Sequence, residues 1–376
     1  MKKKLAYVVS TPRTYLAFIK GHARILRDDY AITLISDFDS YPELSDFEDV
    51  AKIQVGIRRN ISIFHDLTAM MRLIGVLWRG KFDIVHSITP KAGLLASIAG
   101  LLARCPVRVH TFTGQVWATK KGASRWLLKT IDKITLFSTT HSLADSNSQA
   151  EFLRSEGFSK PIGVLGDGAI TGIDTERFRY DEAWRRNTRD RYSLAPDDFV
   201  FVFLGRLNRD KGVLDLVEGF SRANLGPRFK LLIIGPDEAG LTSIIEKNQF
   251  FKMGRIILTG RSTVPEKLLN AGDVLCLPSY REGFGVSILE GAAIGLPAIV
   301  SRIYGLTDAV IEGQTGIMHE AGNADEIAAC LTVFAKDPQM AKQMGTEARA
   351  RVLSNFSPSR VTKELRAFYG KVCQTI

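Results

Sequence analysis

Short apolar runs rich in β-branched and aromatic residues alternate with helical patterns along the whole of this 376-residue sequence. Such alternation favours an α/β fold with doubly wound parallel sheets. The strands expected in the first half are Leu5–Val9, Ile32–Ile35, Ile53–Val55, Asp83–His86, Val107–Phe112, Ser142–Ala144 and Ile162–Leu165. Those in the second half are Asp198–Leu204, Lys230–Ile234, Arg255–Leu258, Asp273–Leu277, Ala298–Val300 and Gly316–Met318. Ligands of such sheets bind at the carboxyl ends of the strands, so function is expected in the loops that follow them.

The length predicts two domains of ordinary size, which we place at residues 1–180 and 190–357. Between them, the polar and glycine-rich run Gly166–Phe178 has the composition of a hinge, although a plain surface loop would have it too. The polar residues 179–197 read as the rest of the connection.

Two glutamates flank a glycine-bearing loop after the strand Asp273–Leu277. Glu282 lies in this loop, and Glu290 lies about one turn inside the helix that follows. Carboxylates at this spacing can contact one ligand from two sides. The free amides of the loop and of the first helical turn can bind an anion. The alternative is structural: Glu282 would cap the helix, and Glu290 would lie on its solvated face.

A second strand–loop–helix unit begins at Asp198–Leu204. Arg206 and Lys211 stand in its loop, between Gly205 and Gly212. An arginine fork and a lysine point charge, next to a helix start, make a workable clamp for a diphosphate. A merely solvated loop is the alternative, and Arg209 is expected to face solvent.

The strings around residues 205–212 and 278–293 resemble those of family 4 glycosyltransferases, which are retaining enzymes of the GT-B fold. The resemblance implies two Rossmann-like domains facing a central cleft, with a terminal helix at about residues 358–373 that returns to the first domain. It assigns Glu282 to the donor sugar, Glu290 to the ribose, and Arg206 and Lys211 to the diphosphate. The remaining donor-binding residues that it implies are Gly205, Gly283, Phe284, Gly285 and Arg261, the last near the nucleobase.

On the acceptor side the sequence departs from the family. Ser10-Thr11-Pro12 stands where many GT-B enzymes carry two glycines, and Thr113 stands where many members have a histidine. His110 would point to the opposite strand face from Thr113, so the histidine's role is not transferred to it. Cleft positions are expected at Thr113, Gly114, His86 and Lys91. His86 could equally be a hydrogen-bonded core histidine.

The resemblance implies a hexosyltransferase that moves a sugar from a nucleotide diphosphate donor, a UDP-sugar above all, to a glycan acceptor. Lipid-linked oligosaccharides of surface polysaccharide synthesis are common acceptors in this branch. Arg206 and Lys211 are expected to take the place of a metal ion at the diphosphate, so no metal and no cofactor are expected. The rivals are a nucleotide-sugar epimerase of the same fold and a two-domain binding protein without chemistry.

Residues 52–133 contain 14 Lys and Arg against 3 Asp and Glu, a net charge of +11. We expect this block either to dock on an anionic membrane or to be a solvated surface. The helical stretches Ile61–Trp78 and Trp117–Phe137 are the candidate membrane faces, with Leu127–Ile134 assigned to core packing. No nucleic-acid-binding motif accompanies the charge.

The sequence contains no apolar run of the roughly 18 residues that a membrane span needs. The apolar run Leu5–Val9 is too short for the core of a signal peptide. The four cysteines have no ligand spacing, so neither disulfides nor a zinc site are expected. These features predict a cytoplasmic protein, peripheral on the inner membrane face if the basic block docks there.

Overall fold

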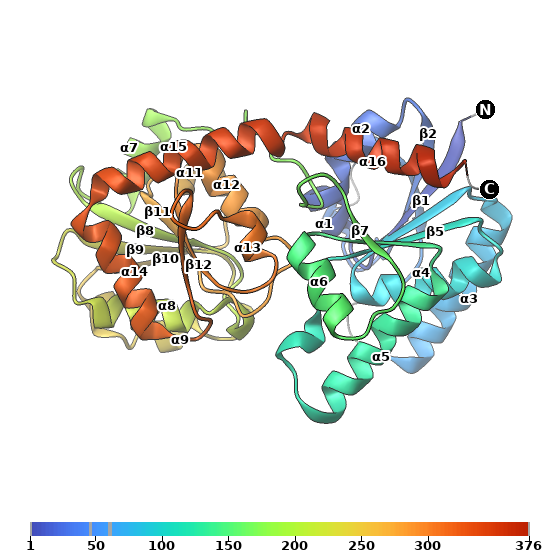
Figure 1. Ribbon diagram of the computed structural model, residues 1–376, viewed down its shortest axis with the longest axis horizontal. Coiled ribbons are helices and arrows are strands. Elements are labelled where there is room, and N and C mark those ends of the chain that lie inside the picture. Colours follow the sequence, from blue (N-terminus) through green and yellow to red (C-terminus); the bar gives the residue numbers. More distant parts are fainter. Residues whose placement is uncertain (1, 45–46, 59–61, 375–376) are drawn as a thin grey trace. The chain divides into compact units, whose positions relative to one another are not determined.

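The computed structural model describes residues 2–44, 47–58 and 62–374. The chain forms two compact units (Figure 1): unit 1 contains residues 1–172 and 358–376, and unit 2 contains residues 173–357. The sequence predicts domains at 1–180 and 190–357, with the terminal helix assigned to the first.

Unit 1 is built on a seven-stranded sheet in the order β3-β2-β1-β4-β5-β6-β7, in which every pair is parallel. Its strands are β1 (Lys3–Val8), β2 (Tyr30–Ser36), β3 (Ala51–Gln54), β4 (Ile84–Ile88), β5 (Val107–Phe112), β6 (His141–Ala144) and β7 (Ile162–Val164). Strands β2 and β3 follow one another on one side of β1, and strands β5, β6 and β7 follow one another on the far side of β4. The order therefore reverses between β1 and β4.

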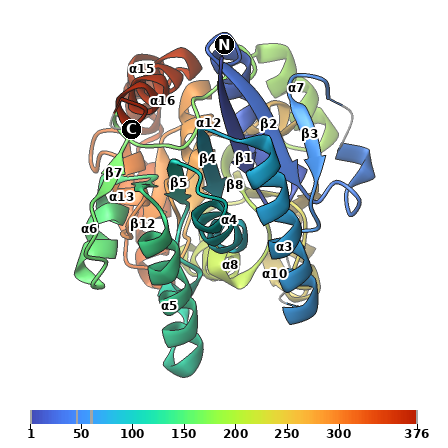
Figure 2. The ribbon, with the colours of Figure 1, turned by 90° about the vertical axis from the view of Figure 1, so that its right-hand side faces the viewer.

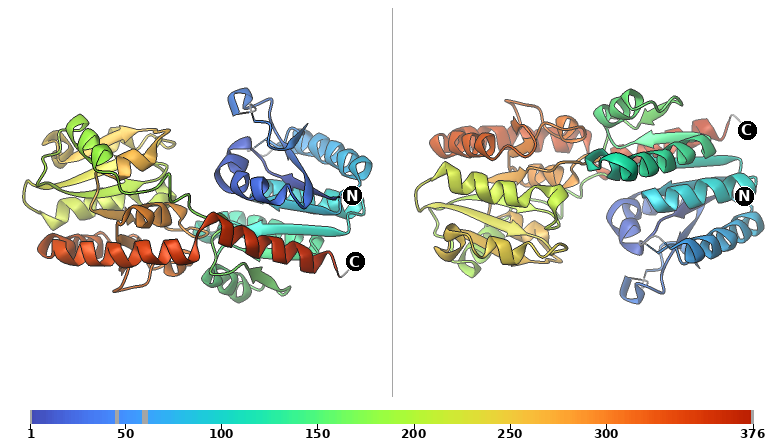
Figure 3. Two further views of the ribbon diagram at one scale, coloured as in Figure 1. Left: turned by 90° about the horizontal axis from the view of Figure 1, so that it is seen from above. Right: turned by 90° about the horizontal axis from the view of Figure 1, so that it is seen from below.

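Helices cover both faces of this sheet (Figures 2 and 3). They are α1 (Pro12–Thr14), α2 (Lys20–Leu26), α3 (Ile63–Gly80), α4 (Pro90–Leu102), α5 (Gly122–Ser138), α6 (Asn147–Ser155) and α16 (Pro358–Val372). A π-helical turn (Tyr15–Ile19) joins α1 to α2, and 3-10 turns form at Pro42–Leu44 and Val116–Thr119. One apolar core lies between the sheet and α2 with α16, and a second lies between the sheet and α3 with α4.

The terminal helix α16 is fixed to unit 1 by polar contacts as well as apolar ones. The Tyr369 hydroxyl donates to the Tyr7 hydroxyl at 2.9 Å, and Arg366 pairs with Asp29 at 2.7 Å. Both tyrosines are fully buried. Because a buried hydroxyl is costly without a partner, these contacts select one docking position for the helix.

The stretch Trp117–Phe137, expected as one helix, is instead a 3-10 turn followed by α5. Lys120 and Lys121 are extended between the two, and Gly122 has a positive φ of 58°. The expectation that Leu127–Ile134 packs in the core is wrong at its ends, because Leu127 and Ile134 are 52% and 44% exposed. The buried face of α5 is formed by Asp132, Thr135, Leu136 and Ser138 instead. The first residue of the stretch Ile61–Trp78 lies outside the described residues.

Unit 2 is built on a six-stranded parallel sheet in the order β10-β9-β8-β11-β12-β13. Its strands are β8 (Phe199–Leu204), β9 (Phe229–Ile234), β10 (Ile256–Gly260), β11 (Val274–Leu277), β12 (Ala298–Ser301) and β13 (Gly316–His319). The central strands are apolar throughout because both faces of the sheet are covered. Here the strand order reverses between β8 and β11.

The helices of unit 2 are α7 (Glu182–Arg191), α8 (Val213–Ala223), α9 (Thr242–Ile245), α10 (Gln249–Lys252), α11 (Pro265–Leu269), α12 (Val286–Ile294), α13 (Leu306–Ala309), α14 (Ala324–Lys336) and α15 (Pro338–Asn355). In α8 the buried residues recur every three or four positions, as an amphipathic helix requires. Reading residues 179–197 as a mere connection was wrong. Within them, α7 is held to the sheet because Arg185 and Arg189 both pair with Asp273.

Candidate functional site

The point where the strand order of unit 2 reverses places two loops next to each other. β8 and β11 are paired in the sheet, and residues 205–212 follow the one as residues 278–285 follow the other. Their connections then run in opposite directions along the sheet, towards β9 and β12. A crevice opens at such a point in parallel sheets, and it is the usual place for a bound nucleotide.

The two loops are locked together by a glycine and by Asp210. Gly212 has a positive φ of 65°, and a Cβ there would lie 2.0 Å from the Pro278 carbonyl oxygen. The Tyr280 amide donates to the Asp210 carbonyl oxygen at 2.8 Å, while the Arg281 Nε pairs with the Asp210 carboxylate at 2.9 Å. Only glycine permits both this backbone conformation and this approach, so the sequence position of Gly212 fixes the geometry of the site.

Lys211 and Glu282 meet across this junction. The Lys211 Nζ forms an ion pair with the Glu282 Oε1, which also accepts a hydrogen bond of 2.8 Å from the Ser279 hydroxyl. The two side chains are 18% and 12% exposed. Partial burial strengthens their attraction relative to water. The structure thus brings together a cation and a carboxylate, both predicted from the sequence to act on one ligand, and shows Glu282 as neither a helix cap nor a solvated charge.

Arg206 begins the same loop and is more accessible. Its Nη1 lies 2.8 Å from the Glu238 Oε2, and both side chains are more than one third exposed. Such a surface pair contributes little to stability, so the guanidinium can exchange Glu238 for an anionic ligand at small cost. The carbonyl of Gly205 lies under Gly235, where a Cβ would approach it to 1.8 Å. Both loop ends are therefore closely packed.

The segment from Gly283 to Gly285 leads into α12. Gly285 has a positive φ of 77° and is the N-cap residue of the helix. The Phe284 side chain, expected at the donor site, is 1% exposed and packs on the Phe356 ring at 5.4 Å between centroids. It supports the loop from inside, so Phe284 can contact a ligand only through its backbone.

Glu290 lies on α12 in a partly buried position. Burial raises the pKa of its carboxyl to about 7, the positive charge of Arg177 opposes this rise, and the negative charge of Glu266 adds to it. The solvated helix face that we held as an alternative would not perturb the pKa in this way. Neither Arg177 nor Glu266 was singled out from the sequence. Arg261, by contrast, follows β10 as an exposed side chain.

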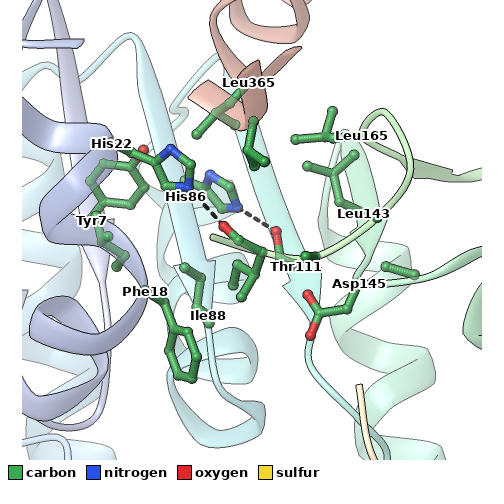
Figure 4. A pocket seen from close by; sticks show the side chains of 16 residues that line it. Tyr7, Phe18, His22, His86, Ile88, Thr111, Leu143, Asp145, Leu165 and Leu365 are labelled. Atoms are coloured by element: carbon green, nitrogen blue, oxygen red, sulfur yellow. Dashed lines mark hydrogen bonds between the residues drawn. The ribbon is translucent and has the colours of Figure 1, made fainter. Parts of the chain in front are cut away.

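In unit 1, His86 is a core histidine rather than an exposed one. Its Nδ1 lies 2.5 Å from the Tyr369 hydroxyl. Its Nε2 lies 2.7 Å from the Thr111 hydroxyl (Figure 4). Burial lowers the pKa of His86 to about 3, so the ring is neutral at ordinary pH. Of the two roles left open for His86, the structure therefore favours the core one.

The other predicted residues of the acceptor side surround the carboxyl ends of β4 and β5. Thr113 and Gly114 directly follow β5, and Gly114 has a positive φ of 92°. His110 is buried against α4, where a Cβ on Gly93 would lie 2.3 Å from its ring. Lys91 is not free, because its Nζ pairs with the Asp66 carboxylate at 2.5 Å.

The loop that replaces the family's two glycines lies at the reversal point of unit 1. The hydroxyls of Ser10, after β1, and Thr89, after β4, are 3.1 Å apart. Thr89 has a φ of 81°, which is costly for a β-branched residue and is found most often at functional sites. Both loops at this reversal point therefore carry hydroxyl groups.

Comparisons with known proteins match both units of the chain to glycosyltransferases. The family model described as "Glycosyl transferases group 1" matches residues 185–351, and that described as "Glycosyl transferase 4-like domain" matches residues 23–167. The capsular polysaccharide biosynthesis glycosyltransferase CapM of Staphylococcus aureus is 30% identical over 376 residues, which cover 98% of each chain.

Two further proteins extend the comparison. An Escherichia coli protein, UDP-Gal:alpha-D-GlcNAc-diphosphoundecaprenol alpha-1,3-galactosyltransferase, is 29% identical over 83% of this chain and 81% of its own. The crystal structure of Anabaena HepE in complex with UDP superposes with a TM-score of 0.78, at 18% identity, over 99% of this chain and all of that one. The two parallel sheets are those of the GT-B fold. The chain belongs to the family 4 type of bacterial glycosyltransferases.

Proposed function

We propose that this protein transfers a sugar from a UDP-sugar to a lipid-linked glycan, with retention at the anomeric carbon and without a metal ion. The observation that carries the proposal is the meeting of Lys211 and Glu282 at the reversal point of the unit 2 sheet, beside Arg206. The name of the Escherichia coli relative supports both substrates, since it joins a UDP-sugar to a diphosphoundecaprenol acceptor.

The chemistry follows from charge. The bond between the sugar C1 and the diphosphate breaks, and negative charge develops on the departing UDP. Arg206 and Lys211 stabilise that charge in place of a metal, since they are fixed before the reaction begins. Lys211 then shares its charge between the diphosphate and Glu282, and Glu282 holds the donor sugar. The acceptor hydroxyl attacks C1 from the face that UDP leaves and passes its proton to a diphosphate oxygen.

A panel of labelled nucleotide sugars, each incubated with the protein without acceptor, tests the reaction class. A transferase should slowly hydrolyse one of the UDP-sugars to UDP and free sugar. Adding a GlcNAc-diphosphoundecaprenol acceptor should accelerate UDP release and label the lipid. An epimerase would interconvert two nucleotide sugars instead, and a binding protein would do neither.

Activity should not depend on a divalent cation. Within the described residues, no group of three or more His, Cys, Asp or Glu side chains is placed to hold a metal ion. The expectation rests on the clamp formed by Arg206 and Lys211, which provides two positive charges where a metal-dependent enzyme uses its ion. EDTA should leave the rate of UDP release unchanged. Loss of activity in EDTA and its return with magnesium or manganese would reject this part of the proposal.

We further propose that unit 1 docks on an anionic membrane through a surface over α3, α4 and α5, called the α3–α5 face. No helix within the described ranges is long and apolar enough to cross a bilayer. α4 packs between α3 and α5, so the three helices form one layer (Figure 2). The exposed large apolar side chains of this layer are Ile63, Phe64, Leu67, Met71, Trp78, Leu101, Leu102, Trp126, Leu127, Ile134 and Phe137. Stripes of this kind suit the boundary between headgroups and acyl chains.

The charges of the α3–α5 face favour an anionic partner. All three acidic residues of the block 52–133 are held in contacts inside unit 1. Asp66 pairs with Lys91, Asp83 accepts from the Lys4 amide, and Asp132 accepts from the Trp117 indole. The exposed cations on and beside these helices are Arg72, Arg79, Lys81, Arg104, Lys120, Lys121 and Lys133. An anionic lipid surface therefore meets apolar and positive groups together.

The structure also corrects which residues of the basic block can take part. Trp117, expected at the membrane, is 1% exposed and stacks on Phe158. Arg125 and Lys129 both bond to Glu156 and lie over the Trp117 ring. Replacing Arg125 or Lys129 would disturb packing, so the docking test must avoid them.

The protein should sediment with vesicles of anionic lipid at low salt and leave them as salt rises. The double variant Lys120→Glu, Lys121→Glu should weaken this binding at least about tenfold, since each basic residue near such a surface contributes about 1 kcal/mol. The double variant Phe64→Glu, Trp126→Glu should abolish it. Met253→Glu is the control and should bind like the wild type, since Met253 is an apolar position of unit 2 that is 67% exposed, against 69% for Trp126.

Two results would contradict membrane docking. Wild-type protein that ignores anionic vesicles at low salt would leave the α3–α5 face without its lipid partner. A wild-type dimer in light scattering that Phe64→Glu, Trp126→Glu converts to a monomer would assign the face to a second copy of the chain.

A further inference from the structure

A polar cavity of unit 1 lies outside the donor site. It has a volume of about 270 Å³ and is formed by the segment after β2, the end of β3 and the first half of α3. Apart from Gly56 and Ala69, every described residue that lines it has a polar or charged side chain. Small-molecule sites have volumes of roughly 300–1,000 Å³, so this cavity suits a ligand of about the size of one sugar residue.

One wall of the cavity is a loop in a fixed conformation. Asp37, which directly follows β2 and is 3% exposed, accepts hydrogen bonds from the Ser40 hydroxyl at 2.7 Å and the Gln54 amide at 3.1 Å. The side-chain oxygen of Gln54 accepts from the backbone amides of Phe38 and Asp39 at 2.6 and 3.3 Å. A carboxylate can accept about four hydrogen bonds, so Asp37 retains capacity for the hydroxyl groups of a ligand.

The positive charge of the cavity comes from other elements. Arg58 follows β3, and His65 and Arg72 lie on α3. Among the residues that the structure describes, neither arginine side chain has a hydrogen bond or an ion pair. The carboxylates of Asp37 and Asp39 line the same cavity without pairing to them. Unpaired charges of both signs around one cavity leave room for a ligand that joins them.

The two kinds of charge call for two different groups on that ligand. Guanidinium groups suit a phosphate, which they bind through paired N–H donors. Carboxylates accept hydrogen bonds from hydroxyl groups. A phosphate ion alone would be repelled by the carboxylates, and a neutral sugar would leave the arginines without an anion. A sugar phosphate satisfies both.

The position of the cavity favours a sugar phosphate that is attached to a lipid. α3 lines the cavity, and the same helix carries Ile63, Phe64, Leu67 and Met71, which are exposed apolar residues of the α3–α5 face. Thr68 lines the cavity and lies one turn after Phe64, so the two side chains are neighbours on the helix surface. The cavity wall therefore adjoins the apolar stripe that we assign to the membrane.

We propose that this cavity binds a sugar phosphate, with Arg58 and Arg72 on the phosphate and Asp37 and Asp39 on the sugar hydroxyls. Its source is the lipid-anchored residue of the acceptor glycan, an assignment that rests on the proposed function. The cavity then holds the acceptor by its anchored end. A free sugar phosphate has the same chemistry, and the experiment below distinguishes the two sources.

Calorimetry with N-acetylglucosamine 1-phosphate tests the site without any transfer reaction. The Escherichia coli relative suggests this probe, because its name contains GlcNAc-diphosphoundecaprenol. The wild type should bind the sugar phosphate, and it should bind inorganic phosphate at least about tenfold more weakly. The double variant Arg58→Gln, Arg72→Gln should lose about a hundredfold in affinity, since each guanidinium supplies a charge-assisted contact of about tenfold.

Two controls show where the probe binds. The double variant Arg79→Gln, Lys81→Gln removes two exposed cations at the end of α3 that do not line the cavity, and it should bind like the wild type. Lys211→Ala removes a cation of the donor site in unit 2 and should also leave this affinity unchanged.

Asp39→Asn tests the part of the cavity assigned to the sugar. Asp39 is exposed and its carboxylate holds no other residue, so the replacement should not disturb the fold. The variant should bind the sugar phosphate several-fold more weakly, because an amide accepts hydroxyl hydrogen bonds less strongly than a carboxylate. It should bind inorganic phosphate as well as the wild type or better, because a repelling charge is removed.

Kinetics with GlcNAc-diphosphoundecaprenol identify the source of the sugar phosphate. Arg58→Gln, Arg72→Gln should raise the KM for this acceptor at least about tenfold, whereas Arg79→Gln, Lys81→Gln should raise it far less. The control loses the same charge near the membrane, so the difference reports on the cavity. An unchanged KM with lost sugar-phosphate binding would overturn the lipid source and assign the cavity to a free sugar phosphate.

Three results would overturn the site itself: a wild type that does not bind the sugar phosphate, binding that survives in Arg58→Gln, Arg72→Gln, or binding that disappears in Lys211→Ala. A wild type that binds the probe in the cavity but releases UDP from no nucleotide sugar would support the site and reject the proposed function.

Discussion

Replacing Lys211 by alanine should lower kcat by about 10²–10³-fold with the fold intact, the loss found when one preorganised charge-stabilising group is removed from an active site. Lys211 has two roles in the proposed site. It offers a positive charge to the departing diphosphate, and it pairs with Glu282, which the variant would leave with the Ser279 hydroxyl. One substitution therefore removes a charge and loosens a second functional group.

UDP release from the donor identified in the nucleotide-sugar panel is the measurement for this variant. Arg206→Ala should also lose at least tenfold, because its exposed pair with Glu238 leaves it free for the diphosphate. Arg209→Ala is the matched control, since Arg209 is an exposed arginine of the same loop. Near-normal kinetics in Lys211→Ala and Arg206→Ala would show that these residues do not stabilise the departing diphosphate.

Glu290→Gln should weaken the binding of free UDP by about tenfold or more, whereas Glu282→Gln should leave UDP binding unchanged and impair the intact UDP-sugar. The reason is where each carboxylate is placed. Glu290 lies within α12, whereas Glu282 pairs with Lys211 in the loop before this helix. A charge-assisted bond to a ribose hydroxyl contributes about 1.5–3 kcal/mol, which corresponds to this loss.

Calorimetry with UDP and with the UDP-sugar, carried out on both glutamine variants, separates these roles. The variants keep side-chain size and remove only the charge, so thermal unfolding should be close to that of the wild type. Equal losses of UDP affinity in Glu282→Gln and Glu290→Gln would contradict the division of labour.

The strands of both units were predictable because central parallel strands are buried on both faces and read as apolar runs. Each expected strand is present, with ends that differ by at most two residues. The helix α7 was missed for the converse reason. It attaches to the sheet through Arg185 and Arg189, which pair with Asp273, and arginines in a polar stretch resemble a surface loop.

The donor loops could be predicted because their glycines and charged residues lie close together in the sequence. Contacts between residues that are distant in the sequence could not be predicted in this way. Glu156, which pairs with Arg125 and Lys129, directly follows α6, well beyond these two residues in the sequence. From the sequence the two cations therefore looked solvated or lipid-facing. The pair of Arg177 with Glu266 was missed for the same reason, since it joins the segment before α7 to α11.

A crystal structure of the protein with UDP would test the central claim most directly. We expect UDP at the reversal point of the unit 2 sheet, with diphosphate oxygens within hydrogen-bond distance of Arg206 and Lys211. We also expect both ribose hydroxyls to donate to the Glu290 carboxylate. UDP bound elsewhere, or with its diphosphate away from Arg206 and Lys211, would contradict it.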